Sequence, residues 1–359
     1  MRGIAILFVF VYHALGTAFG QDQLPWGRWF STLDVPRSFV PLLPVSFGWI
    51  GVTIFFVVSG FCIHLSFSRQ PQWPVFFKRR FFRIYPPYLV SLLFFALAYP
   101  LTRLAFTSRE DAGQFISHLV LLNNLDARYV FGINPAWWSI AVEVQLYALY
   151  PVVIALATRL GWGRALAGIA VLEIGLRLTG DLLHTFRGAG FPRWVCDSPF
   201  YFWFSWSVGA YVAELYLRGR TFPVSRAALA ALGALAVACR YFKPLSSMTF
   251  PLVALLTAGV IVRLLQKNDR RLPLPSILLD HLRRAGLWSF SLYLIHQPLI
   301  FAVPKIAAWA MSGAYIHPLL MFALCSASWF LIMPVARVSY QCCELPGMAF
   351  GKRFLAAKE

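Results

Sequence analysis

The sequence predicts an all-α integral membrane protein, a bundle of about ten transmembrane helices with both termini cytoplasmic. Three observations favour this fold class. Apolar residues make up 59% of the 359 residues and charged residues 13%, whereas soluble chains carry about 25% charged residues. The mean hydropathy is +0.66, and the basic residues gather in short clusters between apolar runs. No stretch has an ordinary soluble composition, so we expect no separate soluble domain.

Ten apolar runs approach the length of about 20 residues that a helix needs to cross a bilayer. They are residues 3–20, 48–67, 84–105, 137–157, 165–180, 200–217, 226–242, 248–265, 286–304 and 317–335. A further run at 115–125 is shorter and more polar, so we expect it to be re-entrant or interfacial. The first run has no basic region before it and no clear cleavage site after it, which predicts a retained span.

The basic residues also predict the orientation. With the N-terminus inside, the inner connections carry roughly twice the Lys and Arg of the outer ones, as the positive-inside rule expects. The formal net charge of +18 is therefore a topology signal, and its clusters also suit anionic lipid or a phosphorylated ligand. We expect a multi-pass protein of the cell inner (plasma) membrane, with membrane lipid as a partner and no nucleic acid.

The first run places two ionisable residues on one helix face. Arg2 and His13 are eleven residues apart, which is about three helical turns and about 16 Å along the axis. Ionisable groups inside a membrane are costly and usually functional. The alternative is a histidine hydrogen-bonded to a neighbouring helix, with Arg2 as an orientation signal.

The stretch NPAWWSIAVEVQLYALYP combines interfacial aromatics with a carboxylate. Trp137 and Trp138 mark a membrane interface, and Glu143 lies about 8 Å deeper. Glu143 shares a face with Ser139 and Tyr147. Because a buried carboxylate must be paired or protonated, Glu143 either neutralises an arginine between helices or orients a catalytic imidazole.

The stretch FFKRRFFRIYPPYL precedes a helix that we expect to begin near Pro86 and Pro87. Arg80 and Arg83 are one turn apart and face together. Arginine forks bind phosphate well, so this pair is a candidate phosphate site. The alternative is ordinary anchoring at the inner membrane surface.

The last polar stretch in an apolar run is SFSLYLIHQPLI. Ser289, Tyr293 and His296 share one helix face. They predict either a second functional histidine or a hydrogen bond that holds two helices together.

Small residues are gathered in the second span. Gly48, Gly51, Ser59 and Gly60 predict tight contact between helices. The six cysteines show no zinc or CxxC spacing, so we expect mostly free thiols and no metal site.

In this order, these stretches resemble the acyltransferase-3 family of integral membrane acyltransferases. The matching motifs are R-x10-H (Arg2–His13), G-V-x-x-F-F-x-x-S-G-F (Gly51–Phe61), R-x-x-R-x-Y-P-P (Arg80–Pro87), W-S-x-x-V-E-x-Q (Trp138–Gln145), S-x-Y-L-x-H-x-P (Ser291–Pro298) and E-x-P (Glu344–Pro346). The resemblance implies a transmembrane acyltransferase domain over residues 1–340 and a short cytoplasmic tail over 341–359.

The resemblance also implies an activity. Family members transfer an acyl group, usually acetyl from acetyl-CoA, to sugar hydroxyls in lipopolysaccharide, exopolysaccharide or other surface polysaccharide, and sometimes to small glycosides. We therefore expect acyl-CoA as the donor, a glycan or glycoside as the acceptor and no permanently bound cofactor. By motif, the essential groups fall on Arg2, His13, Arg80, Arg83 and Glu143.

The expected mechanism divides these residues into two groups. Arg80 and Arg83, helped by Arg2, hold the CoA phosphates, and a pantetheine arm spans the distance from Arg2 to His13. His13 acts as general base or carries the acyl group briefly. The residues expected to meet the acceptor are Trp137, Trp138, Ser139, Tyr293 and His296.

The chain departs from the family pattern at two positions inside its motifs. Thr53 stands where an Asp is usual, and Val144 replaces a second carboxylate beside Glu143. The family also usually carries residues before the arginine, which leaves a start upstream of Met1 open. The rival functions are an acyltransferase for a small-molecule glycoside and, from another class, a transporter of a polar solute or lipid-linked sugar.

Overall fold

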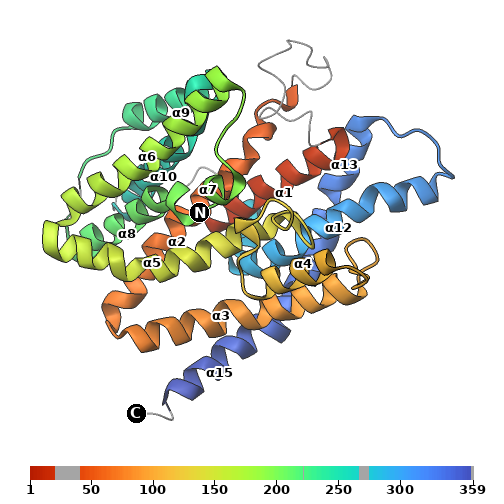
Figure 1. The fold of residues 1–359 in the computed structure, drawn as a ribbon, viewed down its shortest axis with the longest axis horizontal. Helices are drawn as coiled ribbons and strands as arrows, with labels where there is room; N and C mark the ends of the chain where they lie inside the picture. The colour runs from red at the N-terminus through yellow and green to blue at the C-terminus, as the bar shows by residue number, and fades with distance from the viewer. Residues whose placement is uncertain (21–40, 221, 267–274, 357–359) are drawn as a thin grey trace.

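The computed structural model describes residues 1–20, 41–220, 222–266 and 275–356. Within these ranges the chain is helical and contains no strand. The helices are α1 (Arg2–Phe19), α2 (Ile50–Arg69), α3 (Trp73–Leu93), α4 (Arg109–Leu119), α5 (Trp138–Leu160), α6 (Trp162–Arg187), α7 (Arg193–Cys196), α8 (Trp203–Leu217), α9 (Arg226–Tyr241), α10 (Thr249–Leu265), α11 (Ser276–Leu287), α12 (Ser289–Ala310), α13 (Pro318–Ala327), α14 (Trp329–Ser339) and α15 (Leu345–Ala356). Short 3-10 and π-helical turns connect several of them (Figure 1).

Seven helical stretches in the described part of the chain are long and apolar enough to cross a membrane. They are Arg2–Phe19, Val45–Arg69, Trp73–Ala98, Pro135–Leu160, Lys243–Leu265, Ser289–Ala310 and Pro318–Phe354. Each overlaps one of the ten predicted segments, so the prediction of a multi-pass helical membrane protein is confirmed. The other three predicted segments are the helices α6, α8 and α9. Of these, α8 and α9 have only 15 and 16 residues, so the count of ten is not confirmed.

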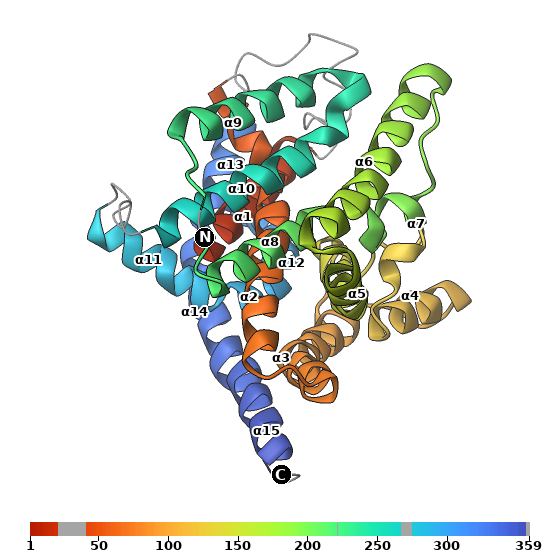
Figure 2. The same ribbon diagram turned by 90° about the vertical axis from the view of Figure 1, so that its left-hand side faces the viewer.

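The first helix lies inside the bundle. It packs against α2, α11, α12 and α13, and its residues Ala5, Ile6 and Phe10 have no exposed surface. Figures 1 and 2 show α1 surrounded by later helices. This central position brings the N-terminal arginine and histidine next to side chains from distant parts of the sequence.

The predicted close contacts at the glycines of the second span are confirmed. A Cβ atom at Gly51 would collide with the carbonyl oxygen of Ala5 in α1. A Cβ atom at Gly60 would collide with the carbonyl oxygen of Trp206 in α8. In the same way, a Cβ atom at Gly209 of α8 would collide with the carbonyl oxygen of Val57 in α2. The helix α2 is therefore held between α1 and α8 by direct backbone contact.

The start of the third span was predicted wrongly. The helix α3 begins at Trp73 and continues through Pro86 and Pro87, so the basic stretch lies within the helix and not before it. Proline removes a backbone donor and normally bends or ends a helix, but membrane helices tolerate it when neighbours compensate. Here the carbonyl of Phe82, which would have accepted from residue 86, faces Gly347 of α15.

The C-terminal part of the chain is also helical. The last apolar stretch runs from α13 through α14 and the π-helical turn η9 (Tyr340–Glu344) into α15. Figures 1 and 2 show α15 alongside α3, where the two helices pack together. The predicted tail at 341–359 thus begins inside η9, and its described part is packed helix. All six cysteines are free thiols, as predicted.

Candidate functional site

A pocket opens among the first parts of α1, α5 and α12, beside the middle of α2 and α3. Its polar lining consists of Arg2, Ser59, Cys62, Arg80, Arg83, Ser139, Glu143, Tyr147, Ser289 and Tyr293. The rest of the wall is apolar and includes Phe55, Phe56 and Ile140. Six of the predicted site residues therefore converge on one pocket, although five different spans contribute its walls.

Carboxylates lie near the three arginines of this pocket but do not pair directly with them in the described structure: Glu143 and Glu344 act on the charge of Arg2 from beyond ion-pair distance. Among the described residues, none of Arg2, Arg80 and Arg83 forms an ion pair. One guanidinium nitrogen of Arg80 donates to the hydroxyl of Ser66 at 3.1 Å, while its Nε atom is buried without a partner among these residues. Cations that lack a charged partner in a largely apolar site are costly, so an anion bound in this pocket would stabilise the three arginines.

Glu143 lies in the same pocket, but hydroxyl groups and not arginines bind it. The hydroxyl of Ser59 donates to its carboxylate at 2.7 Å, and the hydroxyl of Tyr147 donates at 2.5 Å. The indole of Trp206 lies 3.4 Å from the Ser59 oxygen and donates to it. Glu143 is thus held at the arginine pocket by hydroxyl groups, and within the described structure it forms no hydrogen bond with an imidazole. The imidazole nearest to His13 comes from a different helix.

That neighbour of His13 is His296 of α12. The two ring centroids are 5.2 Å apart. The Nδ1 atom of His296 is 2.9 Å from the carbonyl oxygen of Tyr293, to which it donates. This hydrogen bond fixes the tautomer and leaves Nε2 as an acceptor. Within the described structure, the buried Nε2 of His296 and the buried Nδ1 of His13 have no hydrogen-bond partner.

Tyr293 connects the histidine pair to the arginine pocket. Its ring centroid lies 5.3 Å from that of His296, and its side chain lines the pocket. Its hydroxyl lies 2.6 Å from the hydroxyl of Ser139. The predicted Ser139 and Tyr293 are therefore brought together, and Tyr293 contacts both the arginine pocket and His296.

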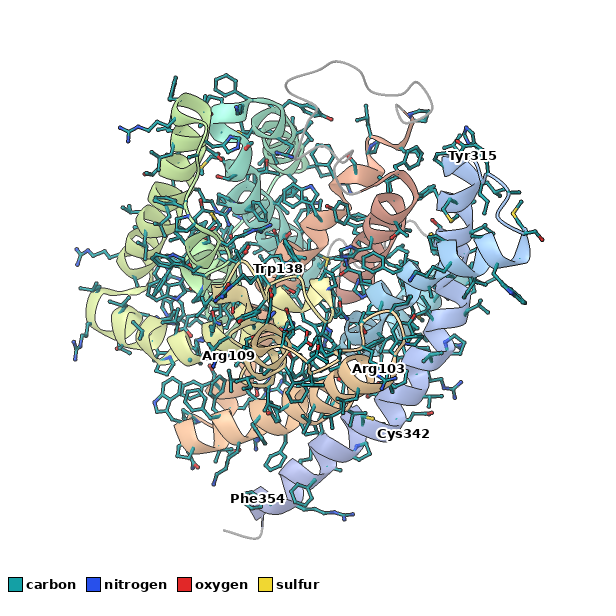
Figure 3. All side chains as sticks on the ribbon, turned by 45° about the vertical axis from the view of Figure 1, so that its right-hand side comes forward. Arg103, Arg109, Trp138, Tyr315, Cys342 and Phe354 are labelled. Atoms are coloured by element: carbon teal, nitrogen blue, oxygen red, sulfur yellow. The ribbon has the colours of Figure 1, made fainter. Side chains whose placement is uncertain are left out.

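Trp137 occupies a different environment from the one predicted. Trp137 has no exposed surface, its indole donates to the carbonyl of Leu294 at 3.2 Å, and its ring packs 4.9 Å from that of Tyr88. A side chain enclosed in this way stabilises the core and has no free face for a sugar. Trp138, labelled in Figure 3, is half-buried and packs against Phe202.

Sequence reasoning assigned Ser59 to helix packing and did not single out Cys62 or Ser66. In the structure all three belong to the site: Ser59 holds Glu143, Cys62 lines the pocket and Ser66 binds Arg80. The signal was present, because their spacing of three and four residues forms a polar stripe on one face of an otherwise apolar helix.

The family is shown by comparison with known proteins. The acyltransferase domain of the acyltransferase-3 family matches residues 1–337, which is nearly the whole chain. The chain therefore belongs to this family of acyltransferases.

One similar relative is the acyltransferase MdmB of Streptomyces mycarofaciens. The two sequences are 29% identical over 186 residues, which cover 48% of this chain and 43% of the relative. The match thus spans less than half of that protein's length. No solved structure matches the chain.

Proposed function

We propose that the protein is a membrane-bound O-acyltransferase that moves an acyl group, most simply acetyl, from cytoplasmic acyl-CoA to a sugar hydroxyl. The acceptor class is a surface polysaccharide or lipid-linked glycan, with a small-molecule glycoside as the second candidate. The observation that carries this proposal is the group of three arginines without carboxylate partners around one pocket. Family membership gives the reaction class, and the arginines match the phosphates of the donor.

In the proposed reaction, Arg2, Arg80 and Arg83 hold the CoA phosphates. The thioester end extends along the pocket past Tyr293 towards His13. His13 takes the proton of the acceptor hydroxyl, whose oxygen attacks the thioester carbonyl. The C–S bond breaks, and the CoA sulfur leaves as a thiolate that recovers the proton. His296, whose Nδ1 is occupied by a carbonyl, positions the His13 ring.

The proposed topology places the donor site on the cytoplasmic side of the inner membrane. All ten predicted segments cross the bilayer, with both termini cytoplasmic. The helix α8 is short, but ten of its 15 residues are buried in the protein, so it does not need to match the full hydrocarbon thickness by itself.

The arginine pocket is tested by binding of acetyl-CoA to the purified protein in lipid nanodiscs. Loss of a charged hydrogen bond costs about 1.5–3 kcal/mol, so Arg80→Gln should raise the Kd about 10- to 100-fold. The matched control is Arg79→Gln. Arg79 is the neighbouring residue on α3, is exposed and binds Gln70 outside the pocket. Equal Kd values for the two variants would refute the phosphate role.

The role of His13 is tested in cells that carry His13→Ala at matched membrane expression. Mass spectrometry of the surface glycans should show loss of the acyl group, while acetyl-CoA binding by the purified variant stays within about twofold of the wild type. Binding is retained because the arginines are unchanged. Full acylation by the variant would rule out His13 as the base, and glycan export without acylation in the wild type would support a transporter.

A further inference from the structure

A second hollow lies between α3 and the C-terminal helical segment, away from the arginine pocket. It has a volume of about 360 Å³. Its walls are apolar side chains and thiols, including Phe82, Pro86, Val90, Cys342, Gly347 and Phe350. No charged side chain lines it within the described structure, so its interior suits a hydrocarbon chain.

The groove is formed where α15 packs closely against α3 at two glycines, while larger side chains on either side of this contact form its walls. A Cβ atom at Gly347 would touch the ring of Pro86, and one at Gly351 would touch Phe82. On either side of this contact the walls face outward, since Val90 is 52% and Phe350 59% exposed. In a membrane-spanning bundle, an outward apolar groove of this kind faces lipid.

Cations gather where the groove approaches the C-terminal end of α15. The two helices run in opposite directions there, and the Nζ atom of Lys78 lies 5.5 Å from the ring centroid of Phe354. Arg353 lies one turn beyond the groove residue Phe350 on α15 and is exposed. Neither α3 nor α15 contains an acidic residue. Figure 3 shows Cys342 further up the C-terminal helical segment and Phe354 near its lower end, at the edge of the molecule.

We propose that this groove binds an anionic phospholipid. One acyl chain lies in the hollow between Phe82, Val90 and Phe350, and the phosphate headgroup binds Lys78 and Arg353. Charge complementarity selects this occupant. A zwitterionic lipid gains little from two cations, and the same face of a second copy carries the same positive charge. The site is separate from the arginine pocket and does not depend on acyl transfer.

The test uses the full chain in nanodiscs of phosphatidylcholine with a trace of phosphatidylglycerol that carries a photoreactive acyl chain. After irradiation, mass spectrometry should map the adducts to peptides of α3 and of η9–α15. The yield should exceed that of a phosphatidylcholine probe with the same chain by about tenfold, since basic residues attract anionic headgroups. The variant Lys78→Gln/Arg353→Gln should remove most of this preference.

Two further variants distinguish lipid binding in the groove from a general attraction of anionic lipid to basic residues. Arg283→Gln/Arg284→Gln in α11 removes the same charge elsewhere and should leave the adducts unchanged. Val90→Trp fills the groove without changing charge and should reduce adducts of both probes. Equal labelling by the two probes, or adducts spread evenly over the bundle, would overturn the proposal. So would crosslinks from these helices to a second copy in place of lipid.

Discussion

At the residue scale, the site is defined by which charges have partners. Glu143 has two hydroxyl donors, while Arg80 has one hydroxyl acceptor and a buried Nε atom without a partner among the described residues. An Arg–carboxylate pair here would have closed the pocket to anions. Because hydroxyls satisfy the carboxylate, the arginines have no direct carboxylate partner within the described part of the chain, and this is the basis of the phosphate role that we propose for them.

Asp197, in the connection between α7 and η7 (Pro199–Tyr201), provides a pH prediction. Burial raises the pKa of this carboxyl from 3.8 to about 6, and Arg193 limits the shift. The charged form is therefore disfavoured in the folded state. Protonated Asp197 therefore contributes to the free energy of unfolding in full below about pH 4, and this contribution is lost as the pH rises through about 6.

We expect Asp197→Asn to raise the free energy of unfolding at pH 8 by up to about 3 kcal/mol, and the gain should vanish near pH 4. Thermal unfolding in nanodiscs from pH 4 to 8 measures this. Asp126→Asn is the control, because Arg128 holds the pKa of Asp126 down at about 2. That variant should show no gain at pH 8. A gain for Asp197→Asn that does not change with pH would contradict the prediction.

At the element scale, backbone contacts at glycines set the positions of the site helices. The helix α2 carries Ser59 and Cys62 into the pocket, and Gly60 lies directly against the backbone of α8. A side chain at this crossing would push α2 away from α8 and shift the neighbouring Ser59, which holds Glu143.

We expect Gly60→Ala to lower the stability of the protein by about 1–3 kcal/mol, the usual cost of overpacking. Gly168→Ala in α6 is the matched control. Gly168 lies within a helix, and a Cβ atom there would have no neighbour within 4 Å, so the change should stabilise by about 0.5–1 kcal/mol. Melting temperatures of both variants, measured in the same detergent, test this. A stable Gly60→Ala protein would show that the α2–α8 contact is not rigid.

The element with the largest error in the sequence analysis was α3. The rule that proline marks a helix start comes from helices in water, where a free carbonyl is easily solvated. In the bundle, Pro86 lies inside the helix, and Gly347 packs on the carbonyl that Pro86 leaves without a donor. This contact involves residues more than 250 positions apart in the sequence, so a local pattern could not have revealed it.

At the scale of the whole molecule, the number of crossings decides where the C-terminus lies. Ten crossings place both termini on the same side, whereas seven place them on opposite sides. Charge asymmetry favours ten, because with seven crossings the basic end of α10, at Arg263, would face outward.

The number of membrane crossings is tested by placing single cysteines in a cysteine-free protein. We expect Arg353→Cys to react with a membrane-impermeant maleimide only from the cytoplasmic side, and Arg109→Cys, at the start of α4, only from the outside. Labelling of sealed vesicles of both orientations gives the measurement. Reaction of both cysteines from the same side would exclude ten crossings and support seven.

The sequence by itself determined the class of protein, the apolar runs that include the seven membrane-length stretches, and six residues of the arginine pocket. These properties follow from composition, run length and motif, which are local. Only the tertiary structure decided which of these residues meet: His13 lies beside His296, Glu143 beside Ser59, and Trp137 inside the core. Helix periodicity fixes the face on which a side chain lies, but the neighbour of that face depends on how the helices pack.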